Sequence, residues 1–106
     1  MALIKSKELR FTPSASPDVV TNKLYITKNG IPLTYDSESY DVGNTIDLDT
    51  QKVHVDLRSF LSQKDGIFDL AIAAIDDVGN EADMMVMLAV PLDFVAPDVV
   101  SGLELL

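Results

Sequence analysis

Four acidic side chains in one short stretch are candidate ligands for a metal ion. Asp76, Asp77, Glu81 and Asp83 lie within eight consecutive positions. Oxygen-rich loops can hold calcium, although this spacing does not match the twelve-residue loop of an EF-hand. Calcium is therefore kept as a candidate, against the alternative of a solvated loop, and no other cofactor is expected.

Side chains that could act as a nucleophile or a general base are scarce. The chain has no cysteine and a single histidine, His54. His54 alternates with Val53 and Val55, as a residue on the outer face of a half-buried strand does. The sequence contains no Ser-His-Asp pattern, HExxH motif or glycine-rich phosphate loop. We therefore expect a protein that is not an enzyme.

The net charge of −9 comes entirely from the C-terminal part of the chain. Residues 65–106 contain nine acidic side chains and no Lys or Arg, whereas residues 1–64 contain eight of each sign. Nucleic-acid binding through phosphates is not expected with this balance. The acidic excess is either a solvated surface that favours solubility or one end of a polar molecule. In the second case Lys5, Lys7 and Arg10 would provide the opposite charge.

Length and hydropathy limit the organisation of the chain. With 106 residues we expect one domain, and the lack of cysteine excludes a disulfide framework. No segment approaches the roughly 20 apolar residues of a membrane span, and the N-terminal stretch lacks the apolar region of a secretory signal. The compartment stays open: cytoplasmic, exported by another route, or extracellular after excision from a longer precursor.

Short alternating segments separated by turn residues predict an all-β chain, and no stretch keeps a helical period over three turns. Asn29-Gly30 is suited to a tight hairpin, and Phe60 and Leu61 are expected to close one end of the core. About seven strands at this spacing predict a two-sheet sandwich. The expected strands are Lys7–Thr12, Thr21–Lys28, Ile31–Tyr35, Gln51–Leu57, Ile67–Ile75 and Asp83–Leu92, with residues 99–106 resembling one more.

Two stretches, ELRFTPSASPDVVTNKLYITKNG and DGIFDLAIAAIDDVGNEAD, resemble the fibronectin type III domain and in part bacterial Ig-like repeats. In that family an aromatic residue ends strand B, and strand F alternates aromatic, apolar, apolar, alanine and aspartate. Phe11 would be the aromatic of strand B, and Phe68 would begin the strand F pattern where the family usually has Tyr. The resemblance covers residues 8–92 and implies an Ig-like β-sandwich over residues 1–95. It implies no particular function, because such sandwiches have many roles.

The resemblance also implies an unusual order of strands. Only Met1–Lys7 precede the strand B segment, which is short for a strand A and a turn. At the other end, FVAPDVVSGLELL resembles a linker followed by the strand A of a next module. The chain then reads B-C-C′-E-F-G-A, with residues 96–106 as a C-terminal tail. We expect this tail to add a strand to a neighbouring subunit, with folding back onto its own chain as the alternative.

The last two predicted strands are more apolar than a sheet with one face in water requires. Between Asp83 and Asp93, nine residues carry no charged or hydrogen-bonding side chain. We predict an exposed apolar patch that marks an interface, unless the tail or residues 36–50 cover it. The expected interface residues are Ala71, Ala73, Ile75, Met84, Met85 and Met87 on these strands, and Val99, Leu103 and Leu105 on the tail.

Two main functional hypotheses follow. The first is a non-enzymatic structural protein that associates with itself, as a homo-oligomer or a head-to-tail filament. The second is an accessory or adhesive module of a larger secreted or surface protein, which binds other proteins or carbohydrate through its loops. The absence of Trp argues against carbohydrate. A repeat made rigid by calcium is a third possibility.

Overall fold

The computed structural model describes residues 2–106. Strands dominate these residues, as the alternating pattern predicted, and a single short helix accompanies them. The elements are β1 (Glu8–Phe11), β2 (Val19–Lys28), β3 (Glu38–Asp41), β4 (Val53–Asp56), α1 (Leu57–Leu61), β5 (Asp65–Asp76) and β6 (Met85–Asp93). No helix among the described residues is long and apolar enough to cross a membrane.

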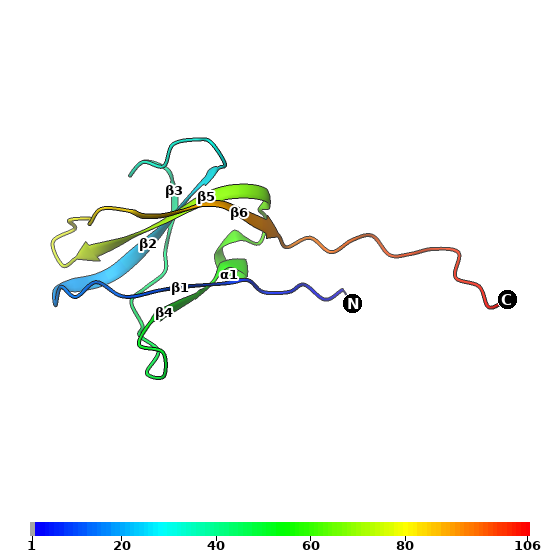
Figure 1. Cartoon of the computed structure of the whole chain (residues 1–106), viewed down its shortest axis with the longest axis horizontal. Coiled ribbons are helices and arrows are strands. Elements are labelled where there is room, and N and C mark those ends of the chain that lie inside the picture. The colour runs from blue at the N-terminus through cyan, green and yellow to red at the C-terminus, as the bar shows by residue number, and fades with distance from the viewer. Residues whose placement is uncertain (1) are drawn as a thin grey trace.

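The strands form two antiparallel sheets (Figure 1). β1 pairs only with β4, and the larger sheet has the order β3-β2-β5-β6. β2 and β5 pair along most of their length, from Val19 opposite Asp76 to Lys28 opposite Phe68. The all-β architecture with two sheets is the one predicted from the sequence.

The core lies between these two sheets. Leu24 and Ile26 of β2 face Val53 and Val55 of β4, and each of the four is at most 3% exposed. Each pair is separated in the sequence by one residue, so the alternation of a strand directs both members to the same side. Leu70 of β5, 1% exposed, belongs to the same cluster.

A short helix closes one end of the core. α1 follows β4 directly, and the carboxylate of Asp56 caps it by accepting a hydrogen bond from the backbone N–H of Arg58 at 3.0 Å. Leu61 is 1% exposed and Phe60 packs against the core, so both occupy the place expected of them. The helical conformation was not predicted, because five residues are too few to display a 3.6-residue period.

The return strand expected at Ile31–Tyr35 is a loop. The turn at Asn29-Gly30 does form, with Gly30 at a φ of 90°. Pro32 has no backbone N–H to donate to a ladder, and the backbone N–H of Thr34 donates to the hydroxyl of Ser37 at 2.9 Å instead. The strand that pairs with β2 is therefore β3, further along the chain.

After β6 the chain leaves the sandwich and extends away from it (Figure 1). Phe94 is still buried at 7% exposure, but every residue from Pro97 to Leu106 is exposed and belongs to no strand or helix. The longest dimension of the molecule, 66 Å, includes this tail. The tail therefore does not fold back onto its own chain.

Candidate protein-binding groove

β6 contains a bulge that decides which of its side chains face the smaller sheet. Phe68 of β5 lies opposite Val90, but Leu70 lies opposite Met87, so β6 has one residue more than β5 in this interval. Ala89 adopts a φ of 56° at this point. Because residues opposite each other in an antiparallel pair share a face, Val90 and Met87 both lie on the core side of the sheet.

The carboxylate of Asp69 holds this bulge in place. It accepts hydrogen bonds from the backbone N–H groups of Ala89 at 3.0 Å and Gly30 at 3.1 Å, and from the side-chain amide of Asn29 at 2.9 Å. The N–H of Ala89 is the largest cause that lowers the pKa of Asp69 below its ordinary value, and the Asn29 amide adds to it. Asp69 thus ties the Asn29-Gly30 turn to the bulge of β6.

The core side of β6 is buried at one end of the strand and open at the other. Val90 and Leu92 are 9% and 2% exposed. Met87 and Met85, on the same face before the bulge, are 51% and 76% exposed. Nothing within the described residues covers this half of the strand, which answers the question raised by its apolar sequence.

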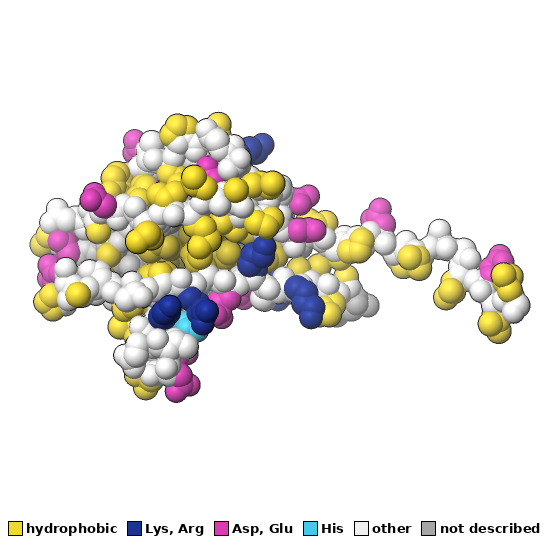
Figure 2. Space-filling view, in the orientation of Figure 1, with side chains coloured by type: hydrophobic (Ala, Val, Ile, Leu, Met, Phe, Trp, Pro, Cys, Tyr) yellow, Lys and Arg dark blue, Asp and Glu magenta, His cyan; other side chains and the backbone are white. Residues whose placement is uncertain are grey.

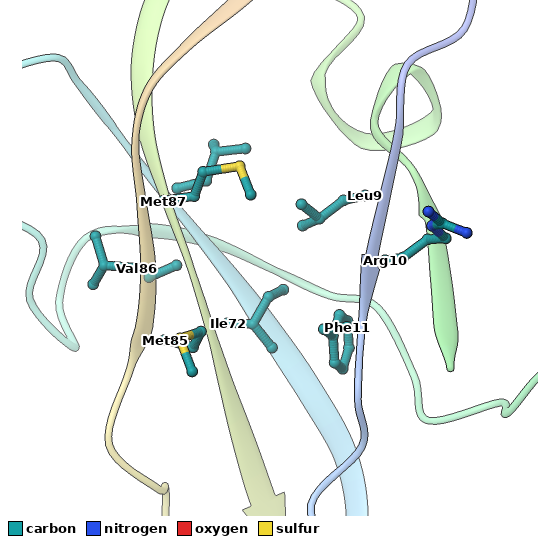
Figure 3. A pocket seen from close by; sticks show the side chains of 9 residues that line it. Leu9, Arg10, Phe11, Ile72, Met85, Val86 and Met87 are labelled. Carbon is teal, nitrogen blue, oxygen red and sulfur yellow. The ribbon is translucent and has the colours of Figure 1, made fainter. Parts of the chain in front are cut away.

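The uncovered half of β6 forms one wall of a groove, and β1 forms the other (Figure 3). Leu9 and Phe11 point from β1 toward Met87 and Ile72, whereas Arg10 points to the opposite side of β1. The groove has a volume of about 160 Å³, and its lining is almost entirely apolar. It lies between the two sheets, with one edge strand of each sheet as a wall.

The two ends of the groove differ. At one end the ammonium group of Lys7, just before β1, donates a hydrogen bond to the carbonyl of Pro91 on β6 and so joins the two walls. At the other end the groove continues into a wider pocket of about 470 Å³, lined in part by Thr12, Lys52 and Asp83. The groove is therefore bridged at one end and continuous with a wider pocket at the other.

Both walls of the groove are sheet edges. β1 pairs only with β4, and β6 pairs only with β5, so each has one side without a neighbouring strand in residues 2–106. Unpaired edges with apolar side chains readily accept a strand from another chain. Figure 2 shows a hydrophobic area across the middle of this face, with Lys and Arg side chains along its border. The extended tail in the same view carries only hydrophobic and acidic side chains among its coloured groups.

The opposite face of the larger sheet is covered by the chain itself, which corrects the expectation for Ala71 and Ala73. These residues do lie on the face opposite Leu70, but they are 2% and 0% exposed. They pack with Tyr25 beneath Leu33, because the loop after the Asn29-Gly30 turn crosses this face. An exposed alanine patch was therefore a wrong prediction, and the loop that covers it begins before the expected covering segment, residues 36–50.

Polar contacts fasten the covering loop. The hydroxyl of Tyr35 donates to the carbonyl of Ala82 at 2.8 Å, and the ring of Tyr35 meets that of Tyr25 edge to face at a centroid distance of 6.0 Å. The hydroxyl of Tyr25 donates to the carboxylate of Glu81 at 2.6 Å, and Lys23 lies 3.2 Å from the same carboxylate. Burial raises the pKa of Tyr25, and the hydrogen bond to Glu81 raises it further.

The predicted interface residues fall into two groups. Met84 packs into the covered cluster with Ala71 and Ala73, and Ile75 is half-buried. The other five are accessible, two in the groove and three on the tail. They are Met85 and Met87, at 76% and 51% exposure, and Val99, Leu103 and Leu105, at 90%, 92% and 101%.

The four calcium candidates are not brought together. Asp76 accepts hydrogen bonds from the backbone N–H groups of Val78 and Asn80 at 3.0 Å and 2.8 Å, which shape its own loop and lower its pKa. Glu81 is bound to Tyr25 and Lys23, and Asp77 and Asp83 are exposed. No group of three or more potential metal ligands was found within residues 2–106.

His54 is engaged in contacts on the outer face of the smaller sheet. Its Nδ1 lies 2.9 Å from a carboxylate oxygen of Glu8 and its Nε2 lies 2.7 Å from the hydroxyl of Thr50. Val53 and Val55, its neighbours on β4, are buried, as the alternation predicted. The three side chains link β1 and β4 and lie on the side away from the groove.

Sequence reasoning missed two residues that shape the groove. Asp69 does not line the groove, but it is 5% exposed and holds the bulge of β6, and a lone carboxylate within an apolar strand was the signal that could have revealed it. Leu9 was recognised as a strand residue but not as part of a wall. Comparison with protein-family models, curated proteins and solved structures gives no match to this chain.

Proposed function

We propose that this chain is a non-catalytic structural module that assembles with copies of itself by strand donation. The C-terminal tail, residues 96–106, leaves one copy and occupies the groove between β1 and β6 of the next. The observation that carries the proposal is this groove, an apolar gap bordered by two sheet edges without partners.

The exposed apolar side chains that border the groove support the proposal that another segment binds there. Met85 and Met87 on the core side of β6 are largely exposed, and so are Val86 and Leu88 on its other side, at 47% and 65%. Four consecutive apolar residues at a sheet edge would favour unspecific aggregation if nothing covered them. Methionine also adapts its shape to a partner at low cost, so this surface is suited to binding.

The tail has the properties of the missing strand. Its nine residues 98–106 equal in number the nine residues of β6, and an extended segment of that length spans about 30 Å. Val99, Leu103 and Leu105 stand four and two positions apart, and side chains at such even spacings lie on one face of a strand. Strand addition provides main-chain hydrogen bonds for affinity and side-chain pockets for specificity.

The proposed fold agrees with this arrangement. The strand order supports a fibronectin type III-like sandwich in which β1, β2, β3, β4, β5 and β6 correspond to strands B, C, C′, E, F and G. In that correspondence the groove beside β1 is the place of strand A. Residues 2–7 form no strand, so this place stays vacant in the described chain.

Deletion of residues 97–106 tests the proposed function. We expect the full chain to form species larger than a monomer and the shortened chain to be a folded monomer, because the deleted residues are exposed and the core ends at Phe94. Light scattering measures the mass, and circular dichroism checks the fold. Two stable monomers of the expected masses would refute self-assembly, and assembly of the shortened chain would refute strand donation.

A further inference from the structure

We infer that the donated tail binds the groove in one orientation and one register, antiparallel to β1, with Glu104 opposite Arg10 of the receiving copy. This inference rests on the proposed function and goes beyond it. It assigns Arg10 a role in docking, fixes the register of the tail, and predicts the symmetry of the assembly.

The two faces of the tail differ in charge. Ser101 and three apolar residues occupy the odd positions, whereas both acids of the segment, Asp98 and Glu104, occupy even positions. The groove is nearly all apolar inside, so the face without charges turns inward and the acids turn outward. The inward face carries Val99, Ser101, Leu103 and Leu105, and with Glu104 opposite Arg10 the two leucines are the members of this face that lie beside β1.

The exposed side of β1 then selects the register. Leu9 and Phe11 point into the groove and Arg10 points outward, on the side to which the tail turns its acids (Figure 3). With Glu104 opposite Arg10, Leu103 and Leu105 lie opposite Phe11 and Leu9 and fill the groove between them and Met85 and Met87.

Neighbouring registers are less favourable. A shift of two residues in one direction places Glu104 opposite Glu8, and like charges directly opposite each other are destabilising. The same shift in the other direction places Glu104 opposite Thr12 and moves Leu103 past the end of β1. The register with Arg10 is the one that joins opposite charges and keeps both leucines within the groove.

The closed end of the groove selects the orientation. The hydrogen bond from Lys7 to Pro91 joins the walls at the end where β6 terminates, and buried Phe94 lies just beyond. An incoming tail therefore enters at the end near Thr12 and Asp83 and runs toward Lys7. It is then antiparallel to β1 and parallel to β6, because β1 begins and β6 ends beside Lys7.

This orientation determines the symmetry. Each tail leaves its own copy at the closed end and enters the next copy at the open end, so the contact is heterologous and repeats in one direction. A tail that entered at the closed end would instead allow two copies to exchange tails as a closed dimer. The inferred orientation predicts a series of oligomers whose size increases with protein concentration.

Charge reversal in the full chain tests the register. Arg10→Glu and Glu104→Arg should each weaken association several-fold, because each places like charges opposite one another, and the double variant should restore it. Sedimentation velocity over a range of protein concentrations measures both the affinity and the size distribution. Equal association by the wild type and both single variants, or no recovery in the double variant, would overturn the register.

A matched pair of serine variants tests the inward face. Leu103→Ser with Leu105→Ser should weaken association by at least about tenfold through the loss of apolar burial. Val100→Ser with Leu106→Ser, on the outward face, should change it little. Equal effects would overturn the assignment of faces, and a closed dimer as the largest species would overturn the orientation. In these cases deletion of residues 97–106 would still abolish association. If that deletion has no effect, the proposed function itself fails.

Discussion

β5 carries apolar side chains on both faces, and the two faces differ in what covers them. On one face Ala71 and Ala73 are nearly inaccessible beneath Leu33 and the loop after β2. On the other face Leu70 is buried, but Ile72 forms part of a groove that stays open between β1 and β6. The first surface belongs to the fold of one chain, and the second is available to another chain.

An apolar strand therefore does not by itself identify an interface. β5 lacks the alternation of apolar and polar residues expected in a half-exposed sheet, because both of its faces are apolar. Only one of these faces is open. Asp69 connects the two surfaces, because it holds both the turn that begins the covering loop and the bulge that directs Met87 into the groove. Four predictions about the free energy of unfolding test this contrast. All variants are made in the chain without residues 97–106, because association through the tail would otherwise add to the measured stability.

The largest difference is expected between two positions on the same face of β6. Leu92→Ala should lower the free energy of unfolding by about 2 to 5 kcal/mol, because it leaves a cavity in the core. Met87→Ala, at the open end, should change it by less than about 0.5 kcal/mol. Urea denaturation measures both values. Similar losses would contradict the division of β6 into a buried half and an open half.

Enlarging an alanine on each face of β5 gives the next effect. Ala73→Leu should cost about 1 to 3 kcal/mol of unfolding free energy, because the added atoms have no space beneath the covering loop. Ala74→Leu, which projects into the wider end of the groove, should stay within about 0.5 kcal/mol of the original chain. Thermal unfolding of the two variants provides the comparison, and a tolerated Ala73→Leu would show that the covered face is not closely packed.

Removing one hydroxyl tests how firmly the covering side is fastened. Tyr25→Phe should lower stability by about 1 to 2 kcal/mol, since the buried hydroxyl donates to a carboxylate. Tyr40→Phe is the control, because its hydroxyl also donates to a carboxylate, that of Glu38, but at the surface. That change should cost less than about 1 kcal/mol. An equal or larger loss at Tyr40 would argue against the importance of the buried contact.

Acid should weaken the link at Asp69, with the smallest effect of the four. Its pKa is lowered in the folded chain, so its contribution to stability is complete above the ordinary value of about 3.8. The contribution is lost as the pH falls through the lower, folded value. Melting temperatures measured from pH 5 down to pH 2 should therefore fall less steeply in Asp69→Asn than in the parent chain. Asp65→Asn, at an exposed position of β5, should retain the steep fall, and a parallel curve for Asp69→Asn would contradict the role of this carboxylate.

Local patterns predicted the strands because alternation is a property of neighbouring residues. The strand predicted at Ile67–Ile75 is present, its residues Phe68, Leu70 and Ile72 pack on the core, and Leu61 closes one end of the core as expected. Ile31–Tyr35 also has a strand-like composition, yet it is a loop, because Pro32 and the local hydrogen bonds of Thr34 compete with pairing. Whether such a segment forms a loop or a strand depends on contacts that cannot be predicted from its composition.

The groove could be predicted only in part. Met85 and Met87 were expected at an interface together with Met84, so the face of β6 on which they lie was not predicted. The bulge at Ala89 decides this, and it depends on a carboxylate twenty positions away along the chain. The apolar residues of the tail were predicted from the sequence to be accessible, and no residue from 2 to 106 covers them.

Residue types and their local order were enough to predict that the chain is made of strands, that its last strand is apolar as far as Leu92, and that a tail of apolar and acidic residues follows. Which apolar surface is closed and which is open depends on the tertiary structure. The reason is that burial depends on where distant segments meet: the loop after β2 crosses Ala71 and Ala73, whereas no segment in residues 2–106 lies between β1 and β6.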